Sequence, residues 1–208
     1  QDISNWITSN VSSMNSMFKG AHNFNSSIQN WNVSNVTSME SLFEDASGFN
    51  QELNSWDVDK VTNMSNMFKN AVLFNSILSN WNTTNVIYMN SMFHNASVFN
   101  EYINNWDTAN VIYMTSMFEG SSSFNQDIGD WNVNNIYYMD FMFKDAIKFN
   151  RSLYYWKSNY TFDVDIGNIT NRDNIVVADL SYTINNVEIS NMFLGATSVE
   201  YIIIIGII

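Results

Sequence analysis

The sequence contains no cysteine and no proline, and only 7 of its 208 residues are glycine. Without cysteine, the chain forms no disulfide, no thiolate nucleophile and no cysteine-ligated zinc site. Without proline, it lacks rigid φ restraints, which fits short repeated turns better than long shaped loops. Basic residues are also scarce, since 8 Lys and Arg stand against 20 Asp and Glu. The net charge of −12 argues against nucleic acid and anionic membranes as partners, because both attract Lys and Arg.

Long apolar runs and catalytic motifs are missing as well. The most apolar segment, residues 201–208, is too short for a transmembrane helix, which needs about 20 residues, so we expect no membrane insertion in this chain. No glycine-rich phosphate loop, nucleophile elbow or HExxH motif occurs. His22 and His94 fall at different positions of the repeat described below, and we interpret both as solvated side chains. We therefore expect no enzyme, no catalytic residue and no cofactor.

What the chain does contain is a repeat. Its 7 Trp residues recur every 25 positions, from Trp6 to Trp156, and Met, Phe and Asn residues follow the same period. A fixed period of this length is typical of a solenoid, in which each unit is covered by its neighbours. We number the 25-residue units as coils, with coil one at residues 1–25 and coil six at residues 126–150. The expected core includes Trp31, Trp56, Trp81, Trp106, Trp131, Phe68, Phe93 and Phe118.

The pattern inside each coil predicts secondary structure. In coil two, Trp31 and Val33 alternate with polar residues, as in a short strand. The apolar residues of 36–46 then recur every three or four positions, which is typical of one face of a helix. Thr37-x-x-Glu40 has the form of a capping box at the start of that helix. The sequence thus predicts an α/β repeat solenoid, similar to leucine-rich repeats, with one short strand and one short helix per 25-residue coil.

The repeat also predicts the domain organisation. Residues 1–156 form the regular part, and residues 157–181 form a degenerate coil in which the Met and Phe positions are lost. Residues 182–208 hold a last recognisable coil with an apolar end, because Met192 and Phe193 lie two periods after Met142 and Phe143. We expect one continuous solenoid. Since Gln1 begins within a unit, we also expect the sequence to be part of a longer protein.

Two sets of polar residues need an interpretation. An Asn follows the second Phe of every coil, from Asn25 to Asn150, and we expect its amide to bond to turn backbone and to neighbouring coils. Carboxylates near the predicted strands could offer oxygen ligands to calcium, but they lack the regular recurrence of a repeated calcium loop. These carboxylates are Asp57, Asp59, Asp107, Asp127 and Asp130. We predict no metal site.

A family resemblance follows from two stretches. The run from Phe49 to Phe68, FNQELNSWDVDKVTNMSNMF, resembles the BspA-like leucine-rich repeat of bacterial surface proteins, which is about 26 residues long. The run from Phe124 to Val133, FNQDIGDWNV, is similar to it again. The resemblance covers residues 1–156, and this chain departs from the family in its 25-residue period. It implies a repeat-containing surface or secreted protein, often involved in adhesion, whose repeats have no enzymatic activity.

One pair of positions changes along the chain. The two residues after the Val or Ile at positions 11, 36 and so on are Ser, Thr or Asn in coils one to three, but Ile-Tyr or Tyr-Tyr in coils four to six. Tyr88, Tyr113 and Tyr138 therefore align, and an aromatic row on a polar surface suits sugar rings or a protein partner. The alternative is drift in composition, with stacking between the tyrosines replacing lost hydroxyl caps. Both interpretations stay open.

The predicted strand face is the second candidate surface. Its outward positions form a polar, mildly acidic strip that includes Asn82, Asp107 and Asn132, and these are candidate binding residues for a protein or glycan. We expect a non-enzymatic solenoid of a cell-surface or secreted protein that mediates adhesion or binds a protein or glycan ligand. The alternatives are an intracellular, cytoplasmic or virion-associated interaction scaffold, and an accessory repeat region of a larger enzyme.

Overall fold

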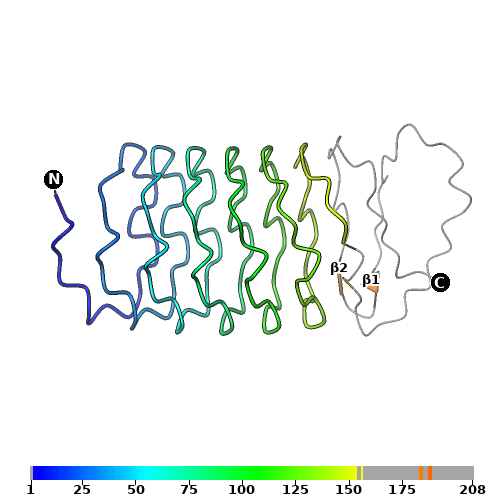
Figure 1. Cartoon of the computed structure of the whole chain (residues 1–208), viewed down its shortest axis with the longest axis horizontal. Helices are drawn as coiled ribbons and strands as arrows, with labels where there is room; N and C mark the ends of the chain where they lie inside the picture. Colours follow the sequence, from blue (N-terminus) through cyan, green and yellow to red (C-terminus); the bar gives the residue numbers. More distant parts are fainter. Residues whose placement is uncertain (1, 154–155, 157–182, 185–186, 189–208) are drawn as a thin grey trace, which may run out of the picture.

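The computed structural model describes residues 2–153, 156, 183–184 and 187–188. Successive 25-residue coils stand side by side along the long axis of the molecule, in the order of the sequence (Figure 1). Backbone hydrogen bonds join the coils, such as the one from the Met39 N–H to the Asn63 carbonyl at 2.9 Å. The repeat of the sequence is therefore also the repeat of the hydrogen bonding.

Each coil is built from consecutive turns. In coil two, the amides of Trp31, Leu42 and Ala46 each donate to the carbonyl three residues earlier, at 3.0, 3.2 and 3.0 Å. An α-helix would need bonds between residues four apart. Alternate amides of the same stretch leave the coil, so that the Phe43 N–H donates to the Met67 carbonyl at 2.8 Å. Turn bonds within a coil and bonds to the next coil thus alternate along the chain.

Left-handed residues explain why this stretch is not a helix. Ser41 has a φ of 56° and Asp45 a φ of 61°, and both conformations recur in coils one to six. A left-handed residue breaks a right-handed helix, and Gly, Asn and Asp tolerate this conformation best. The second left-handed position carries only these three residue types, at Gly20, Asp45, Asn70, Asn95, Gly120 and Asp145.

The prediction of one strand and one helix per coil, and with it the α/β leucine-rich-repeat-like fold class, is wrong. Within the described ranges there is no helix, and the named strands are the short antiparallel pair β1 (Thr183–Ile184) and β2 (Val187–Glu188). The Thr37 hydroxyl caps no helix, because it donates to the Ser12 carbonyl of the preceding coil at 3.2 Å. In this fold, the spacing of three or four positions between apolar residues reflects consecutive turns and not a helix.

One column of residues comes closest to a sheet. In residues 2–153, a single residue of each coil forms a parallel bridge with the equivalent residue of the next coil. We call these positions the bridge column. Its members are Ser13, Ser38, Asn63, Tyr88, Tyr113 and Tyr138.

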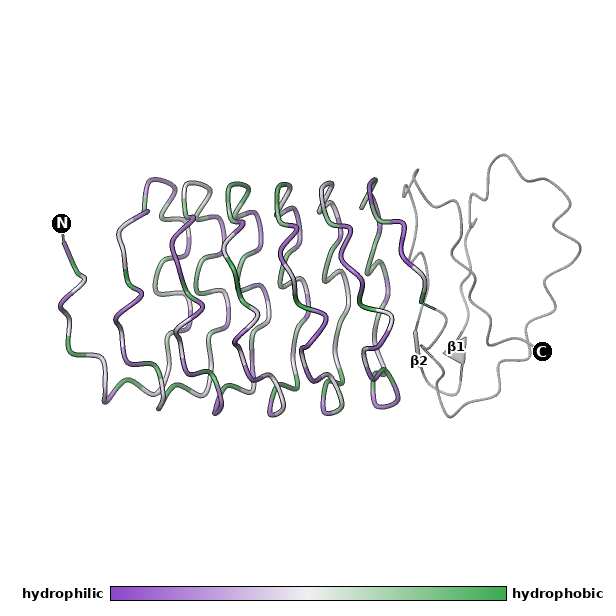
Figure 2. Ribbon diagram, viewed as in Figure 1, coloured by the Kyte–Doolittle hydropathy of each residue, from purple (hydrophilic) through white to green (hydrophobic). Residues whose placement is uncertain are grey.

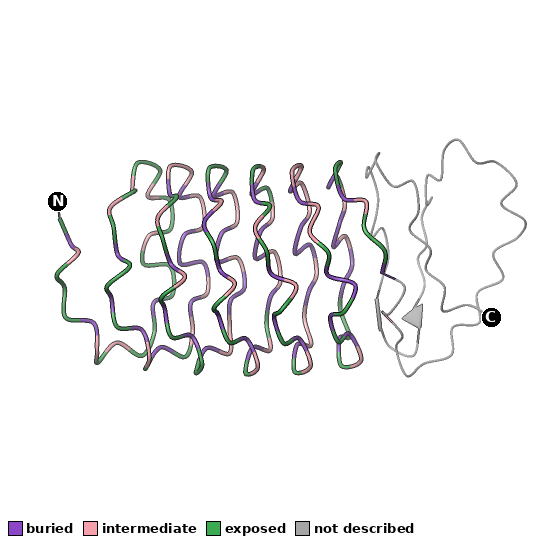
Figure 3. Cartoon of the chain, in the orientation of Figure 1, coloured by how far each residue is buried: buried purple, intermediate pink, exposed green. Residues whose placement is uncertain are grey.

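The interior of the stack is aromatic. Within coil three, the rings of Phe68 and Phe74 lie 3.8 Å apart, and Phe68 stacks on Phe93 of coil four at 5.6 Å. The Trp81 ring packs against Phe68 at 6.4 Å, and its Nε1–H donates to the Leu53 carbonyl at 2.9 Å. Buried and apolar positions recur in each coil (Figures 2 and 3). The Trp and Phe residues expected in the core are all at most 3% exposed.

The asparagine that follows the second Phe also joins neighbouring coils. The Asn75 backbone N–H donates to Asn50 Oδ1 at 2.9 Å, and the Asn100 N–H donates to Asn75 Oδ1 at 2.7 Å. The same bond recurs from Asn25 to Asn150. This is the bonding to backbone that the sequence predicts, and it gives these asparagines a structural role.

The remaining predicted segments are described only in part. The degenerate coil expected at 157–181 lies outside the described residues. Of the last recognisable coil, 182–208, the structure describes β1 and β2 alone. No helix able to cross a membrane is found in the described ranges.

Candidate functional site

A group of exposed and half-buried tyrosine and isoleucine residues lies on coils four to six. The Tyr88 and Tyr113 rings stack with centroids 5.0 Å apart, and the Tyr113 and Tyr138 rings stack at 4.9 Å. Tyr88 and Tyr138 are each 38% exposed, and Tyr137 is 41% exposed. We call the six residues of this surface the tyrosine patch. They are Ile87, Tyr88, Ile112, Tyr113, Tyr137 and Tyr138.

The backbone fixes the tyrosine patch by the same bonds that join all coils. The Ile112 N–H donates to the Ile87 carbonyl at 3.0 Å, and the Tyr137 N–H donates to the Ile112 carbonyl at 2.9 Å. These bonds place the three tyrosines of the bridge column directly above one another. The row that the sequence predicts is therefore present as a continuous stack of rings.

Coils one to three carry polar residues at the same positions, and these residues are hydrogen-bonded. The Thr62 hydroxyl donates to the Thr37 carbonyl at 3.2 Å, and the Ser38 hydroxyl donates to Asn15 Oδ1 at 2.6 Å. Asn63 Nδ2 donates to Glu40 Oε2 at 3.3 Å. At these positions, side-chain hydrogen bonds join neighbouring coils in the first half of the stack, and stacked tyrosine rings join them in the second half.

The second predicted surface has a different character. Asn82, Asp107 and Asn132 are exposed, and the Oδ1 atom of each accepts the backbone N–H two residues further on, at 3.2, 3.0 and 3.0 Å. Such Asx-turns shape the local backbone. The structure does not bring these residues into contact with the tyrosine patch by any described hydrogen bond, and it gives each a structural role that the sequence analysis missed.

Three of the five carboxylates considered for calcium, Asp57, Asp107 and Asp127, are likewise occupied by turns. Asp57 Oδ1 accepts the Asp59 N–H at 3.2 Å, and Asp127 Oδ1 accepts the Gly129 N–H at 3.2 Å. Among the described residues, no three side chains of the types that bind metals come close enough to hold an ion.

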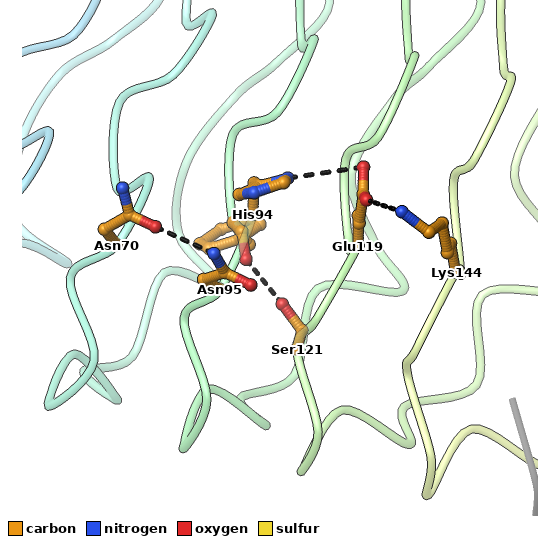
Figure 4. A network of polar contacts seen from close by, with 7 residues as sticks. Asn70, His94, Asn95, Glu119, Ser121 and Lys144 are labelled. Atoms are coloured by element: carbon orange, nitrogen blue, oxygen red, sulfur yellow. Dashed lines mark hydrogen bonds and ion pairs between the residues drawn. The ribbon is translucent and has the colours of Figure 1, made fainter. Parts of the chain in front are cut away.

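A column of alternating charges runs along the stack. Its members are Lys19, Glu44, Lys69, His94, Glu119 and Lys144. Lys19 Nζ lies 2.8 Å from Glu44 Oε2, and Lys144 Nζ lies 2.6 Å from Glu119 Oε1 (Figure 4). His94 Nδ1 is 3.5 Å from Glu119 Oε2, which is a charge contact more than a hydrogen bond.

Burial and neighbouring charges together shift the pKa values of His94 and Glu119 in this column. Burial lowers the pKa of His94, and Lys69 and Lys144 act in the same direction, while Glu119 opposes them. Burial is the largest single influence on Glu119 and would raise its pKa, but the hydrogen bonds from Lys144 and Ser116 and the charges of His94 and Lys144 together lower it. The nearby Ser121 hydroxyl is already committed, because it donates to the Phe93 carbonyl. His94 therefore lies beside the Glu119–Lys144 ion pair, and the hydroxyl of Ser121 is bonded to backbone.

Sequence reasoning missed a second exposed apolar group. Val72, Leu73 and Val98 are 36%, 54% and 41% exposed, and Ile77 and Tyr102 follow at the next surface positions. Equivalent positions in other coils carry Asn23, Ser123 and Glu52, so a comparison of the coils by column would have found them.

Turn-based coils, a continuous aromatic core and a surface that changes between coils define a tandem-repeat solenoid. The pattern of one protein family, described as "Mycoplasma protein of unknown function, DUF285", matches residues 1–98 and 74–175. Because these matches cover most of the chain, the protein belongs to this family. No curated protein and no solved structure matches it.

Proposed function

We propose that the chain is a non-enzymatic binding solenoid of a BspA-like cell-surface or secreted protein, and that the tyrosine patch holds its protein or glycan partner. The observation that carries this proposal is the stack of Tyr88, Tyr113 and Tyr138, whose outer two members are exposed and whose middle member is half-buried, where the first three coils have hydrogen-bonded polar residues. Contiguous exposed apolar residues mark interaction sites, and tyrosine is among the residues that contribute most to binding.

The fold itself does not require the tyrosine patch. Coils two and three have the same turns and the same buried Phe and Trp core with Ser, Thr and Asn at these positions. A solvent-exposed aromatic surface brings no benefit to solubility, whereas it provides binding area at low entropic cost. This difference favours a binding role for the patch over a purely structural one.

The geometry favours a protein partner over a glycan. Sugars pack on the faces of aromatic rings, but the planes of Tyr113 and Tyr138 are within 4° of parallel at 4.9 Å. Tyr88 and Tyr113 are within 13° of parallel at 5.0 Å. Neighbouring rings thus turn their faces toward one another and present mainly edges and hydroxyl groups to the solvent.

The direct test compares the chain with a variant that carries Tyr88→Asn, Tyr113→Ser and Tyr138→Ser. These are the residues of the bridge column in coils one to three, so the replacement keeps the coil's own chemistry. Both proteins are screened against arrays of extracellular proteins and glycans. We expect at least one ligand whose affinity falls about tenfold in the variant, equivalent to about 1.4 kcal/mol. A screen in which no ligand distinguishes the two proteins would overturn the proposal.

A second variant provides the matched control. Leu73→Asn and Val98→Ser remove two members of the other exposed apolar group and replace them with residues that coils one and five carry at the same position. Binding through the tyrosine patch leaves the affinity of this variant unchanged. The location is tested by labelling intact producing cells with a membrane-impermeant reagent, and a chain labelled only after lysis would contradict a surface protein.

A further inference from the structure

The spacing of the stacked tyrosines constrains what can bind along them. The two ring-to-ring steps measure 5.0 and 4.9 Å, together 9.9 Å from Tyr88 to Tyr138. A partner that contacts each of the three coils must repeat at nearly this interval. The tyrosine patch therefore selects for the periodicity of its partner as well as for apolar character.

An α-helix has a suitable period. One turn rises about 5.4 Å, and side chains at i+3, i+4 and i+7 lie about 4.5, 6.0 and 10.5 Å along the helix, so they would meet successive coils within about 1 Å. An extended strand puts same-face side chains about 6.7 Å apart, so two steps span about 13 Å and overshoot the third ring by about 3.5 Å. A helix lying along the solenoid axis fits, whereas a parallel strand does not.

Charge defines the rest of the partner. The six residues of the tyrosine patch are uncharged, while coils four to six hold seven Asp or Glu against two Lys, a net charge of −5. The whole chain has a net charge of −12. A chain with this net negative charge and an uncharged apolar patch attracts a ligand that is apolar on one face and basic on the other.

We propose that the tyrosine patch binds a basic amphipathic α-helix of a protein partner, aligned with the solenoid axis. The proposal rests on the proposed binding function of the patch and names its ligand class. Apolar side chains of the helix lie on the tyrosine and isoleucine side chains, and its Lys and Arg residues are attracted by the net negative charge of these coils. This is the common mode in which a helix presents i, i+3, i+4 and i+7 positions to an apolar surface.

The test uses three labelled peptides of the same length and fluorescence anisotropy. The first has Leu at i, i+3, i+4 and i+7 positions and Lys elsewhere. The second has Glu in place of every Lys, and the third has the composition of the first in strict Leu-Lys alternation, which favours a strand. We expect the first peptide to bind about tenfold more tightly than the other two, and to lose affinity as salt screens the charges.

The two protein variants locate the binding. The triple replacement of Tyr88, Tyr113 and Tyr138 should weaken the first peptide about tenfold, while the Leu73→Asn, Val98→Ser variant binds it like the original chain. Near-ultraviolet circular dichroism is the control that checks whether each variant retains its packed aromatic core. Equal binding of helical and alternating peptides, or binding unaffected by the triple replacement, would overturn the inference.

The outcome also separates this inference from the proposed function. If the peptides fail but an extracellular protein or glycan from the arrays still depends on the three tyrosines, the helix inference falls and the binding function stands. If no ligand of either kind depends on them, both fall.

Discussion

Coils one to three and coils four to six share a core and differ on the surface. Phe68 of coil three and Phe93 of coil four are both fully buried and stack at 5.6 Å. At the bridge column, by contrast, Ser13, Ser38 and Asn63 give way to three stacked tyrosines. The comparison teaches that stacking fixes the interior of every coil, because each ring must fit the next, while outward positions are free to change from coil to coil.

The largest expected effect tests the shared core. Trp56→Ala and Trp81→Ala each remove a ring that is at most 3% exposed and a hydrogen bond from its Nε1–H to a carbonyl of the preceding coil. We expect each to lower the free energy of unfolding by about 3–5 kcal/mol, by equal amounts in the two halves of the stack. Urea denaturation of the two variants measures both values.

Trp6→Ala is the control for this prediction. Trp6 is 55% exposed in coil one, so its loss should cost far less than the loss of Trp81. A similar cost for all three tryptophans, or a melting curve barely shifted by Trp81→Ala, would show that stacking between coils does not hold the array together.

Replacing the tyrosines should cost less than replacing either central tryptophan. Tyr88→Asn, Tyr113→Ser and Tyr138→Ser together remove two stacked pairs, which are worth about 0.5–1.5 kcal/mol each. We therefore expect the free energy of unfolding to fall by about 1–3 kcal/mol. A loss larger than that of Trp81→Ala would make the tyrosine patch a structural element and remove the contrast between core and surface.

How far the sequence could predict this structure depends on which residues carry the information. The Trp period identifies the coils and the buried rings, because only stacking explains such regular spacing. The prediction of a helix in each coil was wrong, because apolar residues such as Met39, Leu42 and Phe43 have the same spacing in a helix and in consecutive turns. Gly, Asn or Asp at the position of Asp45 in all six coils would have distinguished the two, because these residues tolerate left-handed backbone.

One part of the candidate site, the alignment of its tyrosines, could be predicted from the sequence, and another part, the turns made by its polar side chains, could not. The alignment of Tyr88, Tyr113 and Tyr138 follows from the period alone, since equivalent residues of stacked coils lie above one another. The Asx-turns of Asn82, Asp107 and Asn132 depend on side-chain conformation, which the period does not specify. The period therefore predicts which residues align from coil to coil, but it could not predict which side chains are occupied by turns.

The asparagine column should behave alike in the two halves. Asn50 Oδ1 accepts the Asn75 N–H at 2.9 Å, and Asn100 Oδ1 accepts the Asn125 N–H at 2.8 Å. Asn50→Ala and Asn100→Ala each leave a backbone donor without this acceptor, and we expect each to cost about 1–2 kcal/mol in unfolding experiments. A cost in one half alone would show that the two halves do not share the same bonding between coils.

A small pH effect should be confined to the second half, because His94 takes a position held by Lys or Glu in coils one to three. Burial first of all lowers the pKa of His94 below its ordinary value of 6.5, so the unfolded chain takes up this proton at a higher pH than the folded chain. The stability that neutral His94 contributes is complete above that value and is lost as pH falls through the folded pKa.

The comparison of pH 7.5 with pH 5 by urea denaturation measures this effect. We expect the His94→Gln variant to lose less stability on acidification than the original chain, by less than about 1 kcal/mol because the group is partly solvated. Equal losses for both proteins would assign the pH dependence to other groups.

The central claim is that the coils share one core and that their outward residues alone determine where a partner binds. Moving the tyrosine patch to other coils tests this claim most directly. The starting protein is the variant in which Tyr88, Tyr113 and Tyr138 have been replaced. Six further substitutions create the patch in its coils one to three: Ser12→Ile, Ser13→Tyr, Thr37→Ile, Ser38→Tyr, Thr62→Tyr and Asn63→Tyr. Binding of the basic helical peptide is then measured by anisotropy. The account predicts that affinity returns to within about threefold of the original chain. A correctly folded transplant that fails to bind the peptide would contradict it.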